Sequence, residues 1–152
     1  MKVKEIMTKK LVTISPDMLA KEALELLQEM QISGLPVIDG NKKLLGMFTE
    51  KEILVAILPS YLEKVGRFVY DDNPRSIKNK FRELADLPVS RVMRKNVITV
   101  DADTALCEVA RLMLTQKVRR IPVLDKEKKV VGIVSREDVV KAYAMEAGWE
   151  TD

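Results

Sequence analysis

Two stretches of the chain repeat one order of apolar and polar positions. Each has a short apolar run, a stripe at helical spacing, two β-branched runs joined by a polar turn, and a second helical stretch. The first helical stripe consists of Leu19, Ala23, Leu26, Leu27 and Met30. Its counterpart consists of Ala105, Val109, Leu112, Met113 and Gln116. The pattern predicts two copies of a β-α-β-β-α unit.

Strand and helix limits follow from the same pattern. The expected strands cover 11–14, 36–38, 44–48, 97–100, 122–124 and 130–134. Ser15-Pro16-Asp17 and Asp101-Ala102-Asp103 have the side chains that start helices. Thr49 and Ser135 are expected to cap the second helix of each copy, which should end near Ile57 or Tyr143.

The two copies are related by one constant offset of 86 residues. Aligning 3–57 with 89–143 gives 14 identities in 55 positions without a gap, for example Met7 with Met93 and Pro36 with Pro122. Ordinary residue usage would give roughly three or four identities by chance. The alignment therefore indicates an internal duplication. Since neither copy can build a good core alone, the two are expected to pack on each other.

The two copies are separated by an insert that lies outside the repeated pattern. The predicted organisation is a first repeat over 1–57, a helical insert over 58–88, and a second repeat with a C-terminal tail over 89–152. Within the insert we expect a helix over 60–69 and a second one opening at Asp72-Asn73-Pro74, with proline in its first position. Mixed charges favour a structural or interface role, with contact to a partner protein as the alternative.

Composition removes several classes of function. Net charge is +3, from 26 basic and 23 acidic residues, and this balance argues against a nucleic-acid binder. Histidine is absent and Cys107 is the single cysteine, which argues against hydrolytic triads, zinc sites and intramolecular disulfides. No apolar run has the length of a membrane span, and the N-terminus does not resemble a signal peptide. We expect a cytoplasmic, non-membrane protein that is not an enzyme, with no catalytic or metal-binding residues.

The start of the last helix is the best candidate for a ligand site. Ser135 closes a strand, and Asp138 lies one turn further on the same helix face. A carboxylate there could accept hydrogen bonds from ribose hydroxyls, and the helix N-terminus favours an anion. The alternative is a capping box, because Ser-x-x-acidic is its signature. Likewise Arg119, Arg120 and Arg136 form either an anion cradle or a solvated charge run.

Three motifs carry a resemblance to a known family. They are Met-Thr/Arg-Lys, apolar-Pro-Val-apolar-Asp, and Gly-apolar-apolar-Ser/Thr-x-x-Asp/Glu, each present in both copies. In this order and spacing the chain resembles a tandem pair of CBS (cystathionine-β-synthase) domains, a Bateman-type regulatory module. The resemblance implies an α/β fold of the α+β type, with two β-α-β-β-α units packed sheet to sheet about a pseudo-twofold axis. It also implies a non-catalytic homodimer that requires no cofactor.

The resemblance further implies an adenosine-containing ligand (AMP, ADP, ATP or S-adenosylmethionine) in the cleft between the repeats. The implied ligand-binding residues are Thr99, Arg119, Arg120, Ile121, Val134, Ser135, Arg136 and Asp138. A weaker second site would use Thr13, Leu35, Thr49 and Glu52. The second site is expected to be weaker because its carboxylate is a glutamate and because the first repeat lacks the three arginines.

The predicted function is a sensor that reports an adenine nucleotide through its shape, its oligomeric state or its contacts with a separate effector protein. The alternative is a structural dimerisation protein with a vestigial ligand site. The intact Ser135/Asp138 pair and the arginines favour the sensor.

Overall fold

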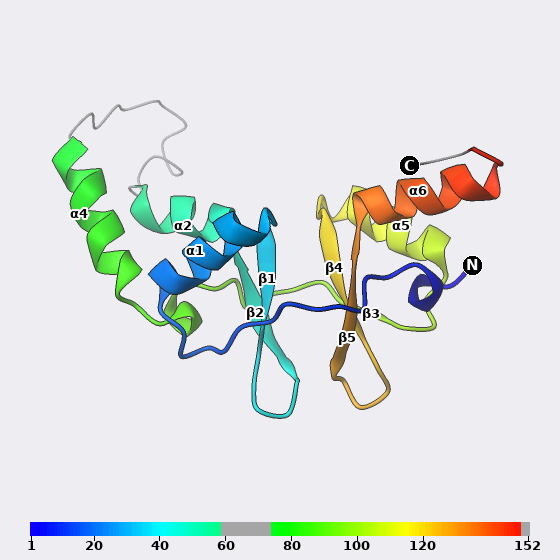
Figure 1. Ribbon diagram of the computed structural model, residues 1–152, viewed down its shortest axis with the longest axis horizontal. Helices are drawn as coiled ribbons and strands as arrows, with labels where there is room; N and C mark the ends of the chain where they lie inside the picture. Colours follow the sequence, from blue (N-terminus) through cyan, green and yellow to red (C-terminus); the bar gives the residue numbers. More distant parts are fainter. Residues whose placement is uncertain (59–73, 150–152) are drawn as a thin grey trace. The chain divides into compact units, whose positions relative to one another are not determined.

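The computed structural model describes residues 1–58 and 74–149, and the side chains of 1–58 and 77–149 (Figure 1). The helix predicted over 60–69 lies outside the described residues. The chain forms two compact units. Unit 1 contains Met1–Val12, Gly40–Leu44 and Val97–Asp152, and unit 2 contains Thr13–Asp39 and Leu45–Asn96. Each unit carries one copy of the predicted strand and helix pattern, which confirms the expected α/β architecture of two repeated units.

Unit 2 holds the strands and helices of the first repeat. Its elements are α1 (Ala20–Met30), β1 (Gly34–Ile38), β2 (Leu44–Thr49, all but its first residue), α2 (Glu50–Ile57) and α4 (Pro74–Ala85). Strands β1 and β2 form a two-stranded sheet. The strand predicted over 11–14 is reduced to a single parallel bridge between Ile14 and Val37. The core is apolar and includes Leu27, Leu35 and Phe48.

The start of α1 differs from the sequence prediction. The Ser15-Pro16-Asp17 segment forms a turn, in which the Asp17 N–H donates to Ser15 Oγ (3.2 Å). The helix itself begins at Ala20, after Leu19 in extended conformation. The Ala20 N–H donates to the carbonyl of Leu87 (2.8 Å). The backbone that follows the insert therefore supplies an acceptor at the start of α1, and the helix forms later than its local signal suggests.

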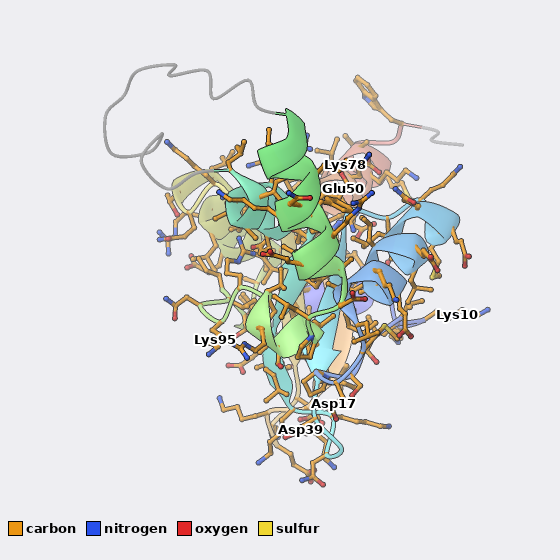
Figure 2. The ribbon with its side chains drawn as sticks, turned by 90° about the vertical axis from the view of Figure 1, so that its left-hand side faces the viewer. Lys10, Asp17, Asp39, Glu50, Lys78 and Lys95 are labelled. Carbon is orange, nitrogen blue, oxygen red and sulfur yellow. The ribbon has the colours of Figure 1, made fainter. Side chains whose placement is uncertain are left out.

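Helix α4 belongs to unit 2. It begins at Pro74, as the sequence predicts, and proline suits the first position because its missing N–H would have no helical partner there. The helix packs against α1 and α2, with Leu84 buried and Phe81 partly exposed. In Figure 2, Lys78 of α4 and Glu50 at the start of α2 lie toward one end of this unit, opposite Asp17 and Asp39.

Unit 1 holds the elements of the second repeat. They are β3 (Val100–Asp101), α5 (Leu106–Thr115), β4 (Arg120–Leu124), β5 (Val130–Ser135) and α6 (Arg136–Glu146). The sheet order is β3-β4-β5, with β3 parallel to β4 and β5 antiparallel to it. On α5 the buried face is Leu106, Val109 and Met113. The predicted stripe was wrong at its ends, because Ala105 and Gln116 are exposed cap residues.

The segment that leads into each repeat packs in the unit of the other repeat. We call 1–12 and 89–96 the leading segments. Val3, in the short 3-10 helix η1 (Val3–Glu5), is fully buried in the core of unit 1, and its N–H donates to Thr104 O (2.9 Å). Val89, in η2 (Val89–Arg91), is fully buried in unit 2, and its N–H donates to Met18 O (2.7 Å). The compact units therefore divide the chain differently from the sequence repeats.

Candidate functional site at the start of α6

The strand-to-helix junction of unit 1 positions Ser135 and Asp138. Ser135 is the N-cap residue of α6, and its hydroxyl accepts from the Asp138 N–H (3.1 Å). Asp138 Oδ2 accepts in return from the Ser135 N–H (2.8 Å). The capping box is thus present. It engages only one carboxylate oxygen, and Oδ1 has no hydrogen-bond partner among the described residues.

A pocket of about 510 Å³ lies beside this carboxylate, within unit 1. Helix α6 and the N-terminal leading segment line it together. The lining residues are Met1, Glu5, Ile6, Asp138, Lys141, Ala142, Met145 and Glu146. Apolar side chains and a few charged groups around a half-buried carboxylate are typical of a small-molecule site.

The three arginines expected near Ser135 have different surroundings. The Arg136 guanidinium turns to the C-terminal end of α5, where Nε donates to Val118 O (3.2 Å) and Nη2 donates to Met113 O (3.3 Å). Arg119 is exposed, and Arg120 is half-buried in β4 opposite Ser135. Arg136 therefore stabilises a helix end, and Arg119 and Arg120 are the two guanidiniums left to face a ligand.

The remaining residues of the expected first site divide into two groups. Ile121 and Val134 pair across β4 and β5, but their side chains are fully buried in the core, so only their backbone could reach a ligand. Thr99 precedes β3 and lines a second pocket of about 350 Å³, together with Thr104 and Glu108 among others. Asp138 and Thr99 therefore border two different pockets of unit 1.

The equivalent junction of unit 2 is built differently. Thr49 precedes α2 as its N-cap but accepts no backbone hydrogen bond, and its hydroxyl instead donates to Glu52 Oε2. Leu35 is fully buried in the core, and Thr13 is half-buried next to the Ile14 bridge. Of the four residues expected at this site, Thr49 and Glu52 are in contact.

Arg94 is a site residue that the sequence interpretation missed. Its Nε lies 3.7 Å from Glu52 Oε1, and that nitrogen is buried without a hydrogen-bond partner in the described part of the chain. The Glu52 side chain is 10% exposed. A signal did exist, because Arg94 is the variable residue of the repeated Met-Thr/Arg-Lys motif. To predict its contact with Glu52, one would need to know that the second copy of this motif packs in unit 2.

Clear pKa shifts occur at two exposed ion pairs of unit 1. Lys4 Nζ donates to Asp103 Oδ1 (2.8 Å), and this hydrogen bond lowers the pKa of the Asp103 carboxyl. A hydrogen bond from Arg111 lowers the pKa of Glu108 in the same way. Among the described residues, no group of histidine, cysteine or carboxylate side chains is arranged to hold a metal ion. None of the described helices has the length and apolar character to cross a membrane.

Comparison with known proteins agrees with the repeat and its two helix-start motifs. The family model described as CBS domain matches residues 3–59 and again 89–145. Two such matches in one chain define a tandem CBS pair. The chain therefore belongs to the CBS domain family.

Among individual proteins, the chain is similar to CBSX1 of Arabidopsis thaliana, a chloroplastic CBS domain-containing protein. The two are 35% identical over 148 residues, which is 92% of this chain and 63% of CBSX1. The share of the relative that is matched varies widely. It is 88% for a CBS domain-containing protein of Dictyostelium discoideum, and 23% for the inosine-5′-monophosphate dehydrogenase of Methanocaldococcus jannaschii. The dehydrogenase match thus covers a minor part of that enzyme.

Solved structures give the same fold. The structure of CBSX2 in complex with AMP superimposes with a TM-score of 0.74 at 31% identity, covering 96% of this chain and 98% of that one. The CBS domain pair of protein MJ0100, in complex with 5′-methylthioadenosine and S-adenosyl-L-methionine, gives a TM-score of 0.69 at 25% identity, with the same coverage. Relatives of this chain therefore bind adenosine-containing ligands.

Proposed function

We propose that this protein is a non-catalytic regulatory module that binds an adenosine-containing ligand at the start of α6. The observation that carries the proposal is the Asp138 carboxylate, which caps its helix through Oδ2 and keeps Oδ1 for another donor beside a pocket. Ligand occupancy would be reported to a separate effector protein or through the oligomeric state. The binding of AMP and S-adenosylmethionine by relatives supports this choice of ligand class.

Each part of such a ligand has a matching group in unit 1. Carboxylate Oδ1 of Asp138 can accept a hydrogen bond from a ribose hydroxyl. The N-terminus of α6 adds the positive end of a helix dipole, which favours a negative phosphate nearby. Arg119 and Arg120 form no ion pair with a described residue and can supply guanidinium donors.

One observation favours the competing function, a structural dimerisation protein with a vestigial site. Ser135 and Asp138 satisfy each other in the capping box, and Arg136 is held by backbone carbonyls. Both groups thus have a structural use that needs no ligand. The experiment must therefore separate the cap from the ligand contact.

Isothermal titration calorimetry with AMP, ATP and S-adenosylmethionine makes this separation. Asp138→Ala removes the acceptor and the carboxylate half of the capping box, whereas Ser135→Ala removes the hydroxyl half of the box and keeps the carboxylate. Hydrogen bonds to a charged group contribute about 1.5–3 kcal/mol, so Asp138→Ala should weaken binding roughly tenfold to a hundredfold. Exposed Glu137→Ala is the matched control and should leave affinity unchanged. No heat of binding from any of these ligands at millimolar concentration would refute the proposal.

A homodimer and a cytoplasmic location are further parts of the proposal. The equivalent helices α2 and α6 expose apolar side chains at matching positions, with Leu54 55% and Val140 67% exposed. Exposed apolar faces of this kind favour association. Light scattering after size exclusion tests the dimer, and cell fractionation tests the location. A monomer at all concentrations would refute the homodimer. Recovery in a membrane or organelle fraction would refute the cytoplasmic location.

A further inference from the structure

The two leading segments make the same backbone contact but present different side chains. Thr8 exchanges two hydrogen bonds with Ile133 of β5 (2.9 and 3.1 Å). Arg94 exchanges two with Met47 of β2 (2.9 Å each). Each pair lies within one unit, and its strand residue, Ile133 or Met47, stands two positions before the N-cap of the carboxylate-bearing helix of that unit. One structural position next to the candidate site is therefore threonine in unit 1 and arginine in unit 2.

This difference decides what the neighbouring carboxylate contacts. In unit 2, Glu52 receives the Thr49 hydroxyl on Oε2 and faces the Arg94 guanidinium with Oε1. In unit 1, the short Thr8 side chain makes no hydrogen bond with Asp138, whose Oδ1 stays without a partner among the described residues. Both oxygens of Glu52 are thus engaged within the protein, while one oxygen of Asp138 is not.

We infer that Arg94 closes the nucleoside position of unit 2 by occupying Glu52, which makes Arg94 the residue that sets how many ligands this chain binds. The inference rests on the proposed function, in which a carboxylate at this position accepts a ribose hydroxyl. A neutral hydroxyl would have to displace a guanidinium from a carboxylate that is 10% exposed. The Arg94 side chain is 35% exposed, but its Nε is buried and already lacks a hydrogen-bond acceptor. Moving Glu52 away would therefore take the neighbouring carboxylate from a buried nitrogen of a charged group.

The structure gives a different reason for weak ligand binding in unit 2 than the sequence does. From the sequence, the length of the glutamate and the lack of the three arginines in the first repeat are the reasons to expect a weak site. The structure instead assigns the effect to an arginine that is present and that comes from the leading segment 89–96. The two explanations predict opposite results when that arginine is removed.

The test counts AMP molecules bound per chain by titration calorimetry on the full chain. The wild type should bind one AMP, and Arg94→Thr, which copies the residue of unit 1, should bind two. Arg91→Thr is the matched control, because it removes an exposed charge from the same segment and should still bind one. The converse variant, Thr8→Arg with Asp138→Glu, recreates the unit 2 pair in unit 1 and should weaken the remaining site at least tenfold.

The outcomes separate this inference from the proposed function. One site in the wild type, lost in Asp138→Ala, with one site still in Arg94→Thr, overturns the inference and leaves the proposed function standing. A loss of binding in Arg94→Thr also overturns it, since Arg94 would then hold the ligand. No binding by any folded variant, judged by circular dichroism, overturns both.

Discussion

Shortening Val3 to alanine tests whether the N-terminal leading segment is a structural part of unit 1. Val3 is fully buried among core residues of the second repeat, including Leu106 and Val109. The substitution removes two methyl groups, about 1.6 kcal/mol of transfer free energy at about 0.8 kcal/mol each. The residual cavity raises the expected loss to about 2–3 kcal/mol. For a chain of this size, that corresponds to a fall in Tm of about 5–10 °C.

Urea unfolding followed by circular dichroism measures the loss, and native-state hydrogen exchange locates it. Exchange should accelerate in peptides from 97–149, far from residue 3 in sequence, and less in 13–39. Val140→Ala makes the same chemical change at a 67% exposed position of unit 1 and should cost under about 0.5 kcal/mol. Equal effects of the two substitutions, or faster exchange confined to 13–39, would show that the segment does not pack as described.

Three further predictions concern packing, capping and acidity. Gly46→Ala should destabilise by about 1–3 kcal/mol in chemical unfolding, since the new Cβ would lie 2.6 Å from a backbone oxygen of the leading segment 89–96; no loss would contradict this close approach. Ser135→Ala should cost about 1 kcal/mol and Thr49→Ala clearly less, because only Ser135 accepts a backbone N–H; equal costs would contradict the asymmetry. The lowered pKa of Asp103 gives stability that is present above about pH 4 and is lost as pH falls through the folded-state value. Asp103→Asn should therefore flatten the fall in Tm as the pH drops below about 4, and an unchanged profile would refute the link.

Local signals in the sequence predict most of the elements. Helix α4 begins at Pro74, α2 ends at Ile57, and the paired strands β4 and β5 contain the apolar runs expected there. These features depend on residue type and periodicity over a few positions. The starts of α1 and α5 are exceptions. Helix α5 begins at Leu106 and not at the predicted Asp101-Ala102-Asp103. The first N–H of each helix donates to a carbonyl that local sequence cannot bring near, that of Leu87 for α1 and that of Met1 for α5.

The candidate site is only partly predictable for the same reason. The Ser135/Asp138 pair follows from spacing along one helix, and the structure places both as expected. The contacts of the Arg136 side chain could not be predicted, because its acceptors are the carbonyl of Met113 in the last turn of α5 and that of Val118 just after the helix. The Glu52–Arg94 contact joins residues from different repeats, so it depends on the packing of the leading segments.

The packing of the leading segments also constrains the order in which the two units can fold during synthesis. Unit 2 consists of residues 13–39 and 45–96, so the whole unit has been synthesised before residue 97 is added. Val3 is made before them, but the other buried residues of its core cluster lie between 100 and 142. Domains generally fold as units as they emerge. Val3 must therefore wait, with its apolar side chain uncovered, until the second repeat has been made.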